Sequence, residues 1–287
     1  MQVKASGITD VGLKREGNED SFSLDESLNL FVVADGMGGH LAGEVASQIA
    51  VEMITKSYRK WIENETREDE LFGVPDSSLS LQGNYIESSI KLANQVVYEM
   101  ALEYKRYHGM GTTVVILLVL PSLIIAANVG DSRLYLIRND KIERLSKDHT
   151  IVSEQVEMGM MTEEESETSP LKHVLTRNLG SAEKVEPDVF EIEPSNNDRF
   201  VLCSDGLTDL VSDEEILQMA LNENDPENLC SQFVEKALKR GGHDNTTVIS
   251  IFLSDVAGPN KGLIKKIGIL FADLVIGVQK AIKKIKP

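Results

Sequence analysis

Five acidic residues of this sequence lie at the ends of short apolar runs, and each is close to a glycine. They are Asp20, Asp35, Asp131, Asp205 and Asp244. A single Asp-Gly pair is typical of a hairpin turn. Several carboxylates gathered at one place repel each other, by about 4 kcal/mol per pair at 4 Å and an effective dielectric near 20. A fold that brings them together therefore needs protons or cations there.

Oxygen ligands and glycine favour one class of cation. Mg²⁺ and Mn²⁺ prefer carboxylates, backbone carbonyls and water, and a glycine lets its carbonyl approach an ion without a Cβ in the way. Arg15 precedes Glu19 and Asp20 in the chain. A guanidinium binds phosphate through two parallel hydrogen bonds, so cations beside an arginine indicate a phosphorylated substrate. The alternative role of Arg15 is a surface ion pair.

Six motifs, in this order along residues 7–253, resemble those of a known family. They are Arg15-x-x-Asn-Glu-Asp20, Asp35-Gly-Met-Gly-Gly-His40, Gly111-Thr-Thr113, Gly130-Asp-Ser-Arg133, Ser204-Asp-Gly206 and His243-Asp-Asn-Thr246. The ordered set resembles the metal-dependent serine/threonine phosphatases of the protein phosphatase 2C family. The Asp-Gly-Met-Gly-Gly-His form is similar to the bacterial branch of that family.

The resemblance implies a fold and a two-cation site. The fold is α+β, a β-sandwich of two antiparallel sheets flanked by helices on both sides. Two divalent cations, Mn²⁺ or Mg²⁺, are implied in a cleft at one end of the sandwich. By position, Asp35 would bridge both cations and the Gly36 carbonyl would bind one, while Asp205 and Asp244 would bind the other.

Further residues take implied roles around these two cations. Glu19 and Asp20 would act mainly through cation-bound waters, and Arg15 would hold the phosphate. Asp131, together with Asp205, matches the position of a third and weaker cation in bacterial relatives.

The expected reaction is hydrolysis of phosphoserine and phosphothreonine in proteins. Two cations about 3.5–4 Å apart lower the pKa of a bridging water, and the resulting hydroxide attacks phosphorus in line. This mechanism needs no phosphoenzyme, and neither Cys203 nor Cys230 begins a Cys-x5-Arg element. The residue that donates a proton to the leaving group is not assigned. His40 is one candidate, its alternative role being a cap of the following helix, and a cation-bound water is another.

Other classes of protein fit the sequence less well. His243-Asp244 prompts a His/Asp phosphohydrolase, but the other four histidines show no matching pattern, and a Ser-His-Asp hydrolase lacks the Gly-x-Ser-x-Gly element. Leu41 breaks a Gly-x-Gly-x-x-Gly reading of the glycine-rich stretch. A catalytically silent scaffold that binds phosphoproteins remains the alternative from another class. Phosphate release with Mn²⁺ separates the two.

The elements that must position these residues come in runs. The expected strands are 21–24, 30–34, 112–120, 123–128, 133–137, 200–204 and 246–253, and the expected helices are 42–61, 85–107, 213–221 and 226–240. Runs of strands, rather than strict strand–helix alternation, favour antiparallel sheets with helices outside. Residues 1–257 are expected to form one catalytic domain. Its polar segment 148–180 matches the family's flap beside the active site.

Composition excludes several partners and locations. The 287 residues are 41% hydrophobic and 26% charged with a net charge of −17, a balance typical of globular proteins that bind no nucleic acid. Two cysteines fit a reducing cytoplasm. The first residues lack an apolar signal region, and no apolar stretch is long enough to span a membrane. Phosphoproteins, and a serine/threonine kinase that acts on the same substrates, are the expected partners.

The charge is unevenly distributed along the chain. Residues 258–287 hold seven lysines and one aspartate, for a charge of +6, which leaves −23 on residues 1–257. At helical spacing, residues 261–286 place apolar side chains on one face and lysines on the other. Such a helix suits a membrane surface or a partner protein. A helix folded back onto the acidic domain is the alternative.

Overall fold

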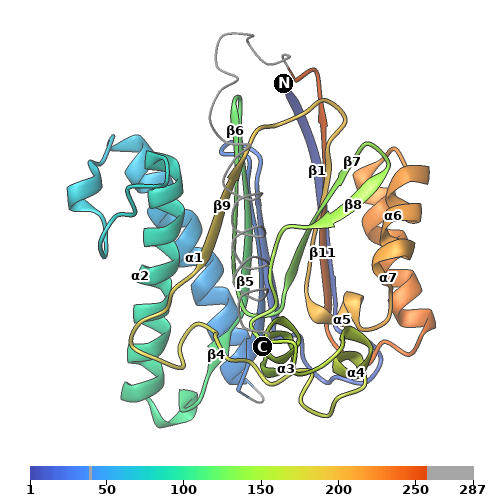
Figure 1. Ribbon diagram of the computed structural model, residues 1–287. Helices are drawn as coiled ribbons and strands as arrows, with labels where there is room; N and C mark the ends of the chain where they lie inside the picture. Colours follow the sequence, from blue (N-terminus) through green and yellow to red (C-terminus); the bar gives the residue numbers. More distant parts are fainter. Residues whose placement is uncertain (39–40, 257–287) are drawn as a thin grey trace, which may run out of the picture. The chain divides into compact units, whose positions relative to one another are not determined.

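Two antiparallel sheets form the centre of the computed structural model, which describes residues 1–38 and 41–256 (Figure 1). The first sheet has the order β1 (Gln2–Asp10), β11 (Thr246–Ser254), β10 (Arg199–Cys203), β7 (Arg133–Arg138) and β8 (Lys141–Arg144). The second has the order β2 (Asp20–Asp25), β3 (Leu30–Met37), β5 (Val114–Leu120), β6 (Leu123–Val129) and β9 (Asp188–Ile192), and β4 (Gly111–Thr112) pairs with β3.

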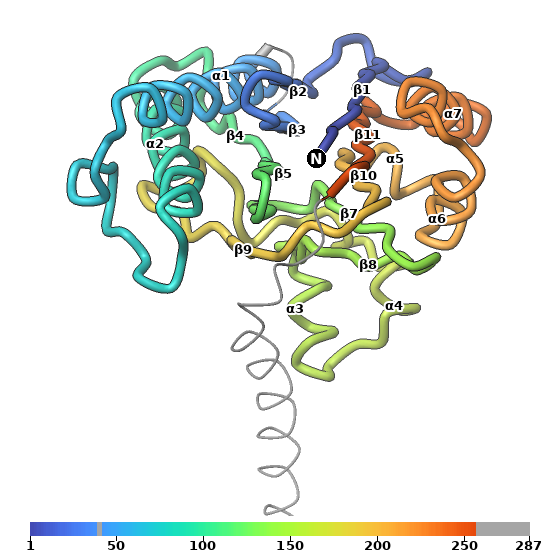
Figure 2. The backbone as a smooth tube through the Cα atoms, turned by 90° about the horizontal axis from the view of Figure 1, so that it is seen from above, coloured from blue at the N-terminus to red at the C-terminus, as the bar shows by residue number. Residues whose placement is uncertain are grey.

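Helices cover the outer face of each sheet (Figure 2). The long helices α1 (Leu41–Glu63) and α2 (Leu81–Glu103) pack on the second sheet, and α6 (Asp213–Asn222) and α7 (Pro226–Lys239) pack on the first. Three short helices, α3 (Ile151–Glu157), α4 (Glu163–Glu167) and α5 (Asp205–Thr208), and two 3-10 turns, Glu68–Glu70 and Lys105–Tyr107, complete the described elements. The predicted α+β sandwich with helices on both sides is confirmed.

Alternation along the strands builds three apolar layers. In β3, Phe31 and Val33 point into the layer between the sheets, whereas Leu30 and Val32 point into the layer under α1 and α2. All four side chains are fully buried. Successive side chains of a strand point to opposite faces, so strands covered on both faces read as continuous apolar runs. This is why the sequence predicts the central strands well.

Two predicted elements differ from those in the structure. The helix expected over 85–107 is α2, which begins earlier, at Leu81, because the Ser80 side chain accepts a hydrogen bond from the N–H of Gly83 and caps it. It ends at Glu103, before the separate 3-10 turn. The strand expected over 112–120 divides at Thr113 into β4 and β5, which keep one register against β3; here the Asp35 N–H donates to the Thr113 side-chain Oγ1.

Some predictions concern residues outside the described part of the chain. His40 and the helix expected over 261–286 belong to these. The described residues Met1–Val256 form one unit, and the separation of a tail from the catalytic domain stays a prediction. Across residues 1–38 and 41–256, no helix has both the length and the apolarity that crossing a membrane would require.

Candidate metal centre

The five acidic residues predicted to converge do so where the two sheets meet. Asp35 lies near the end of β3, and Asp20 begins β2 directly opposite it in the antiparallel register. Asp205 begins α5 just after β10, and Asp244 lies two residues before β11. Asp131 lies in the connection from β6 to β7. Contributions from both sheets therefore meet at one end of the sandwich.

Thr112 and Thr113 fix the backbone of Asp35 through main-chain and side-chain hydrogen bonds. The Thr113 N–H donates to the Asp35 carbonyl (2.8 Å), and the Asp35 N–H donates to Thr113 Oγ1 (3.0 Å). Thr112 Oγ1 also donates to the Asp35 carbonyl (2.9 Å). Thr113 Oγ1 lies 2.7 Å from Ser132 Oγ, which follows Asp131. The backbone groups of Asp35 are thus occupied, and its carboxylate is left for the cleft.

Two glycines allow the segments to approach closely. A Cβ on Gly36 would lie 2.1 Å from the Gly43 carbonyl oxygen and 2.6 Å from that of Glu19. A Cβ on Gly206 would lie 2.0 Å from the Asn245 carbonyl oxygen. All three distances are far below van der Waals contact. The Asp-Gly pairs of the sequence are therefore close-packing positions, not the hairpin turns that each pair suggests alone.

Asp20 is a buried carboxylate that joins the sheets. Its Oδ2 accepts hydrogen bonds from Ser204 Oγ and Thr247 Oγ1, both 2.7 Å. Its Oδ1 is buried and has no hydrogen bond within the described residues. Burial raises the pKa of Asp20 to about 7, and the nearby charges of Asp205 and Asp244 add to this, although the two hydroxyls oppose it.

Burial and mutual repulsion also act on the neighbouring carboxyls. Burial, followed by the charges of Asp20, Asp205, Asp131 and Asp244, holds the pKa of Asp35 well above its ordinary value. Burial and the charge of Asp205 raise the pKa of Asp131 to about 7. Repelling carboxylates, all-oxygen donors and an orphaned buried oxygen are what divalent cations such as Mn²⁺ and Mg²⁺ would satisfy. The residues present fit such cations.

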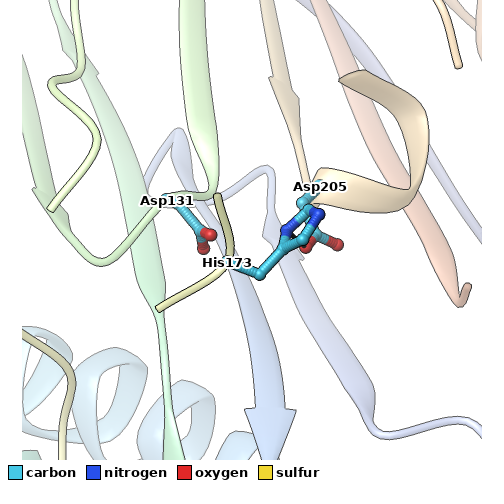
Figure 3. A group of neighbouring side chains, drawn as sticks. All are labelled: Asp131, His173 and Asp205. Carbon is cyan, nitrogen blue, oxygen red and sulfur yellow. Dashed lines mark ion pairs between the residues drawn. The ribbon is translucent and has the colours of Figure 1, made fainter. Parts of the chain in front are cut away.

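His173 is a member of this cluster that the sequence did not reveal. Its Nδ1 lies 3.3 Å from Asp205 Oδ2, and its Nε2 lies 3.3 Å from Asp209 Oδ2. Burial would raise the pKa of Asp205, but the hydrogen bond and charge of His173, together with Asp35 and Arg15, lower that pKa below its ordinary value. Ligand atoms of Asp131, His173 and Asp205 all lie within 4.8 Å of one another (Figure 3).

Arg15 and Glu19 reach the same cleft from the loop between β1 and β2. Arg15 Nη2 lies 2.6 Å from Asp244 Oδ2, and this hydrogen bond is the largest factor that raises the arginine pKa. The guanidinium is half-exposed. The Glu19 N–H donates to Asn245 Oδ1 (2.8 Å), and a Cβ on Gly43 would lie 2.7 Å from Glu19 Oε1. Arg15 therefore makes an ion pair, but with a carboxylate of the cleft.

The fold is a sandwich of two antiparallel sheets, and carboxylates from both sheets lie beside an arginine at one end of it. This combination is typical of a metal-dependent phosphatase. The sequence profile described as Protein phosphatase 2C matches residues 6–246, and the chain belongs to this family.

Relatives agree with this assignment over most of the chain. The serine/threonine phosphatase stp of Listeria innocua is 34% identical over 246 residues, which cover 85% of this chain and 93% of the relative. The crystal structure of Stp1 from Staphylococcus aureus matches with a TM-score of 0.77 and 34% identity, covering 88% and 96% of the two chains. The catalytic domain of the phosphatase PstP, in complex with two manganese ions, matches with a TM-score of 0.74 and 32% identity, covering 88% and 99%. The chain is thus a metal-dependent protein serine/threonine phosphatase.

Proposed function

We propose that Asp35, the Gly36 carbonyl, Asp205 and Asp244 hold two divalent cations, with Asp35 between them. The convergence of these carboxylates at the meeting edge of the sheets is the observation that carries the proposal. Glu19 and Asp20 support the site through water. A third, weaker cation belongs between Asp131 and Asp205, where close carboxylates and a raised pKa of Asp131 favour it. The relative that binds two manganese ions supports Mn²⁺ as the first cation to test.

The chain's own residues orient the phosphorylated substrate. Arg15 is half-exposed at the cleft and contacts Asp244; once Asp244 binds a cation, the planar guanidinium can pair with two phosphoryl oxygens instead. Cations bound here supply an activated water and stabilise charge on the phosphoryl group. Both cysteines are buried, and burial raises the pKa of Cys203 to about 12 and that of Cys230 to about 11, which leaves them protonated and poorly nucleophilic. A phosphocysteine intermediate is therefore disfavoured, which supports direct hydrolysis by water.

The test combines cation binding with catalysis. Isothermal titration with Mn²⁺ and phosphate release from a phosphothreonine peptide are measured for the wild type, Asp244→Asn and Asp140→Asn. The last is an exposed turn residue at φ 57°, where asparagine fits equally well, and serves as the matched control. We expect Asp244→Asn alone to lose at least ten-fold in Mn²⁺ affinity and most of the activity. EDTA abolishes release, and Mn²⁺ restores it. Unchanged Mn²⁺ binding by Asp244→Asn would reject the ligand assignment.

Phosphoproteins are the substrates, and we propose a serine/threonine kinase of the same cell as the source of their phosphates. The relatives named as serine/threonine phosphatases support this substrate class. Phosphoproteomes of cells with the wild type and with Asp205→Ala would identify the proteins concerned. If no site gained phosphate in the variant cells, that result would contradict this role.

The basic segment after residue 257 is proposed to be a tail separate from the catalytic domain. Its +6 charge and amphipathic pattern support binding to a surface of anionic lipids from the cytoplasm. The full chain is compared with a chain that ends at Val256 for sedimentation with vesicles of phosphatidylglycerol and of phosphatidylcholine. Only the full chain should sediment, and only with the anionic vesicles. Equal partition of both chains would refute membrane binding.

A further inference from the structure

A cavity of about 520 Å³ adjoins the metal centre on the side of the flap. Its walls come from α3, α4 and the first turn of α6, and it extends to Asp131 and Asp205. A substrate whose phosphate lies at the carboxylate cluster therefore has an open space next to it. The volume is sufficient for one or two side chains beside the phosphorylated residue.

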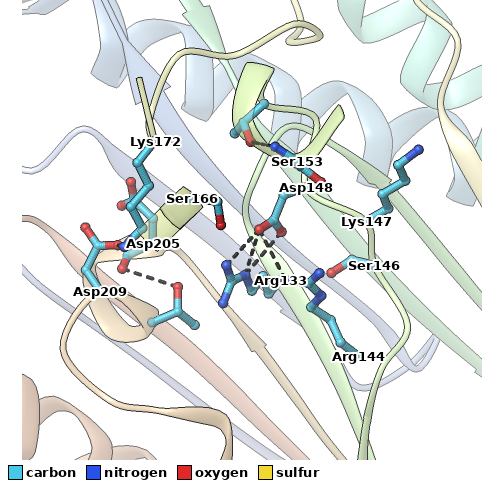
Figure 4. A network of polar contacts seen from close by, with 12 residues as sticks. Arg133, Arg144, Ser146, Lys147, Asp148, Ser153, Ser166, Lys172, Asp205 and Asp209 are labelled. Atoms are coloured by element: carbon cyan, nitrogen blue, oxygen red, sulfur yellow. Dashed lines mark hydrogen bonds and ion pairs between the residues drawn. The ribbon is translucent and has the colours of Figure 1, made fainter. Parts of the chain in front are cut away.

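The basic side chains that line this cavity already form ion pairs with carboxylates of the protein. Arg133 and Arg144 both contact the one carboxylate of Asp148, with shortest distances of 2.7 and 3.2 Å (Figure 4). Lys172 Nζ lies 2.7 Å from Asp209 Oδ1. These basic groups are thus engaged by carboxylates of the protein itself, and an acidic ligand would have to compete with them.

Carboxylates on two walls of the cavity have no such partner. Glu163 and Glu167 lie four residues apart in α4, and therefore on one face of that helix. Asp213 and Glu214 face the cavity from α6, where Asp213 accepts a hydrogen bond from the Tyr135 hydroxyl (2.7 Å) and Glu214 one from Gln218. Within residues 1–38 and 41–256, no lysine, arginine or histidine pairs with any of these four. All four are exposed, so their charges can meet a basic ligand that enters the cavity.

The rest of the lining favours a lysine or arginine side chain over a metal ion as the ligand. Val152 and Val156, four residues apart in α3, add an apolar strip to the wall. Lysine and arginine bury a methylene stem against such a strip and keep the charged end among polar groups. A metal ion instead needs ligands that converge, and among the described residues that line this cavity only the ligand atoms of Asp131, His173 and Asp205 do so, at its inner end.

We infer that this cavity receives a lysine or arginine side chain of the phosphoprotein substrate, and that Glu163 and Glu167 select it. The inference rests on the proposed placement of the phosphate at the carboxylate cluster. It makes the flap helix α4 a specificity element for phosphorylated sites with a basic neighbour.

The experiment uses the full chain with Mn²⁺ and a set of phosphothreonine peptides. One lysine, or one glutamine in its place, is moved from four residues before the phosphothreonine to four residues after it. Exposed ion pairs are weak individually, and several together predict a kcat/KM for lysine over glutamine that is about 5- to 30-fold higher at one or two positions. The preference should fall with added salt, because the carboxylates are exposed.

Variants assign the preference to the carboxylates. Glu163→Gln/Glu167→Gln should reduce the lysine-to-glutamine ratio to below about two-fold. Glu164→Gln is the matched control, because it removes the same charge from α4 but does not line the cavity, and it should keep the wild-type ratio. Equal kcat/KM for all peptides with the wild type, or a preference that survives in the double variant, would overturn the inference alone. No phosphate release from any peptide would overturn the proposed function with it.

Discussion

Replacement of Asp20 by asparagine should make the metal-free protein more stable, although it removes a hydrogen-bonded side chain. The wild-type carboxylate is buried between the sheets, faces other carboxylates and has one oxygen without a hydrogen bond in the described structure. Asparagine has nearly the same shape. Its amide oxygen can still accept from Ser204 and Thr247, but it carries no charge to repel Asp205.

The magnitude follows from the pKa of Asp20. The difference between about 7 in the folded protein and the ordinary 3.8 corresponds to about 4 kcal/mol of destabilisation at neutral pH. The asparagine amide nitrogen would be buried without a hydrogen-bond partner, which costs about 1–3 kcal/mol and offsets part of this gain. We therefore expect Asp20→Asn to raise the free energy of unfolding by about 1–3 kcal/mol at pH 7.5. Because the folded-state pKa is the higher one, wild-type stability should fall as the pH rises from about 4 to 7 and then level off.

The assay is urea unfolding in EDTA between pH 5 and 8, with Asp140→Asn as the control. The control should follow the wild type, and Asp20→Asn should show a smaller loss of stability with pH. Addition of Mn²⁺ should then stabilise the wild type more than Asp20→Asn, because cations relieve the repulsion that the variant lacks. A variant less stable than the wild type in EDTA at pH 7.5 would refute this reasoning.

Two further substitutions test close packing and charge away from Asp20. Gly206→Ala places a Cβ 2.0 Å from the Asn245 carbonyl, so Mn²⁺ affinity should fall at least ten-fold by titration calorimetry; wild-type affinity would show that the two segments separate freely. Arg138→Met leaves the fully buried Asp198 without its two 2.7 Å bonds from arginine, and unfolding should become about 3–5 kcal/mol easier in urea. The exposed pair of Arg67 makes Arg67→Met the control, with less than about 1 kcal/mol expected.

Short-range signals explain why much of the site could be predicted. Asp35-Gly36 lies in the last residues of β3 and Asp205-Gly206 comes just after β10, so the pattern marks the strand ends as well as the carboxylates. The glycines themselves report close approach, as the space around Gly206 confirms. Site residues that lie at a strand end next to a glycine can therefore be predicted from the sequence.

Residues that depend on tertiary contact alone were not predictable. His173 reaches Asp205 from the flap, 32 residues before it in the chain, and its surrounding sequence contains no motif. β1 also escaped the strand prediction, because Gly7 and several polar residues interrupt its apolar pattern, yet it pairs with β11 along its whole length. The short helix α4, in a polar segment, carries too little apolar periodicity to be seen.

The Asp20 carboxylate sets a limit on when the enzyme can become active during synthesis. Its two hydroxyl partners lie 184 and 227 residues further along the chain, the second in the last strand of the described structure. In a nascent chain that has not yet reached Thr247, the first sheet also lacks β11, the strand between β1 and β10. We therefore expect catalytic competence only after β11 has been synthesised, and products truncated before this strand should release no phosphate.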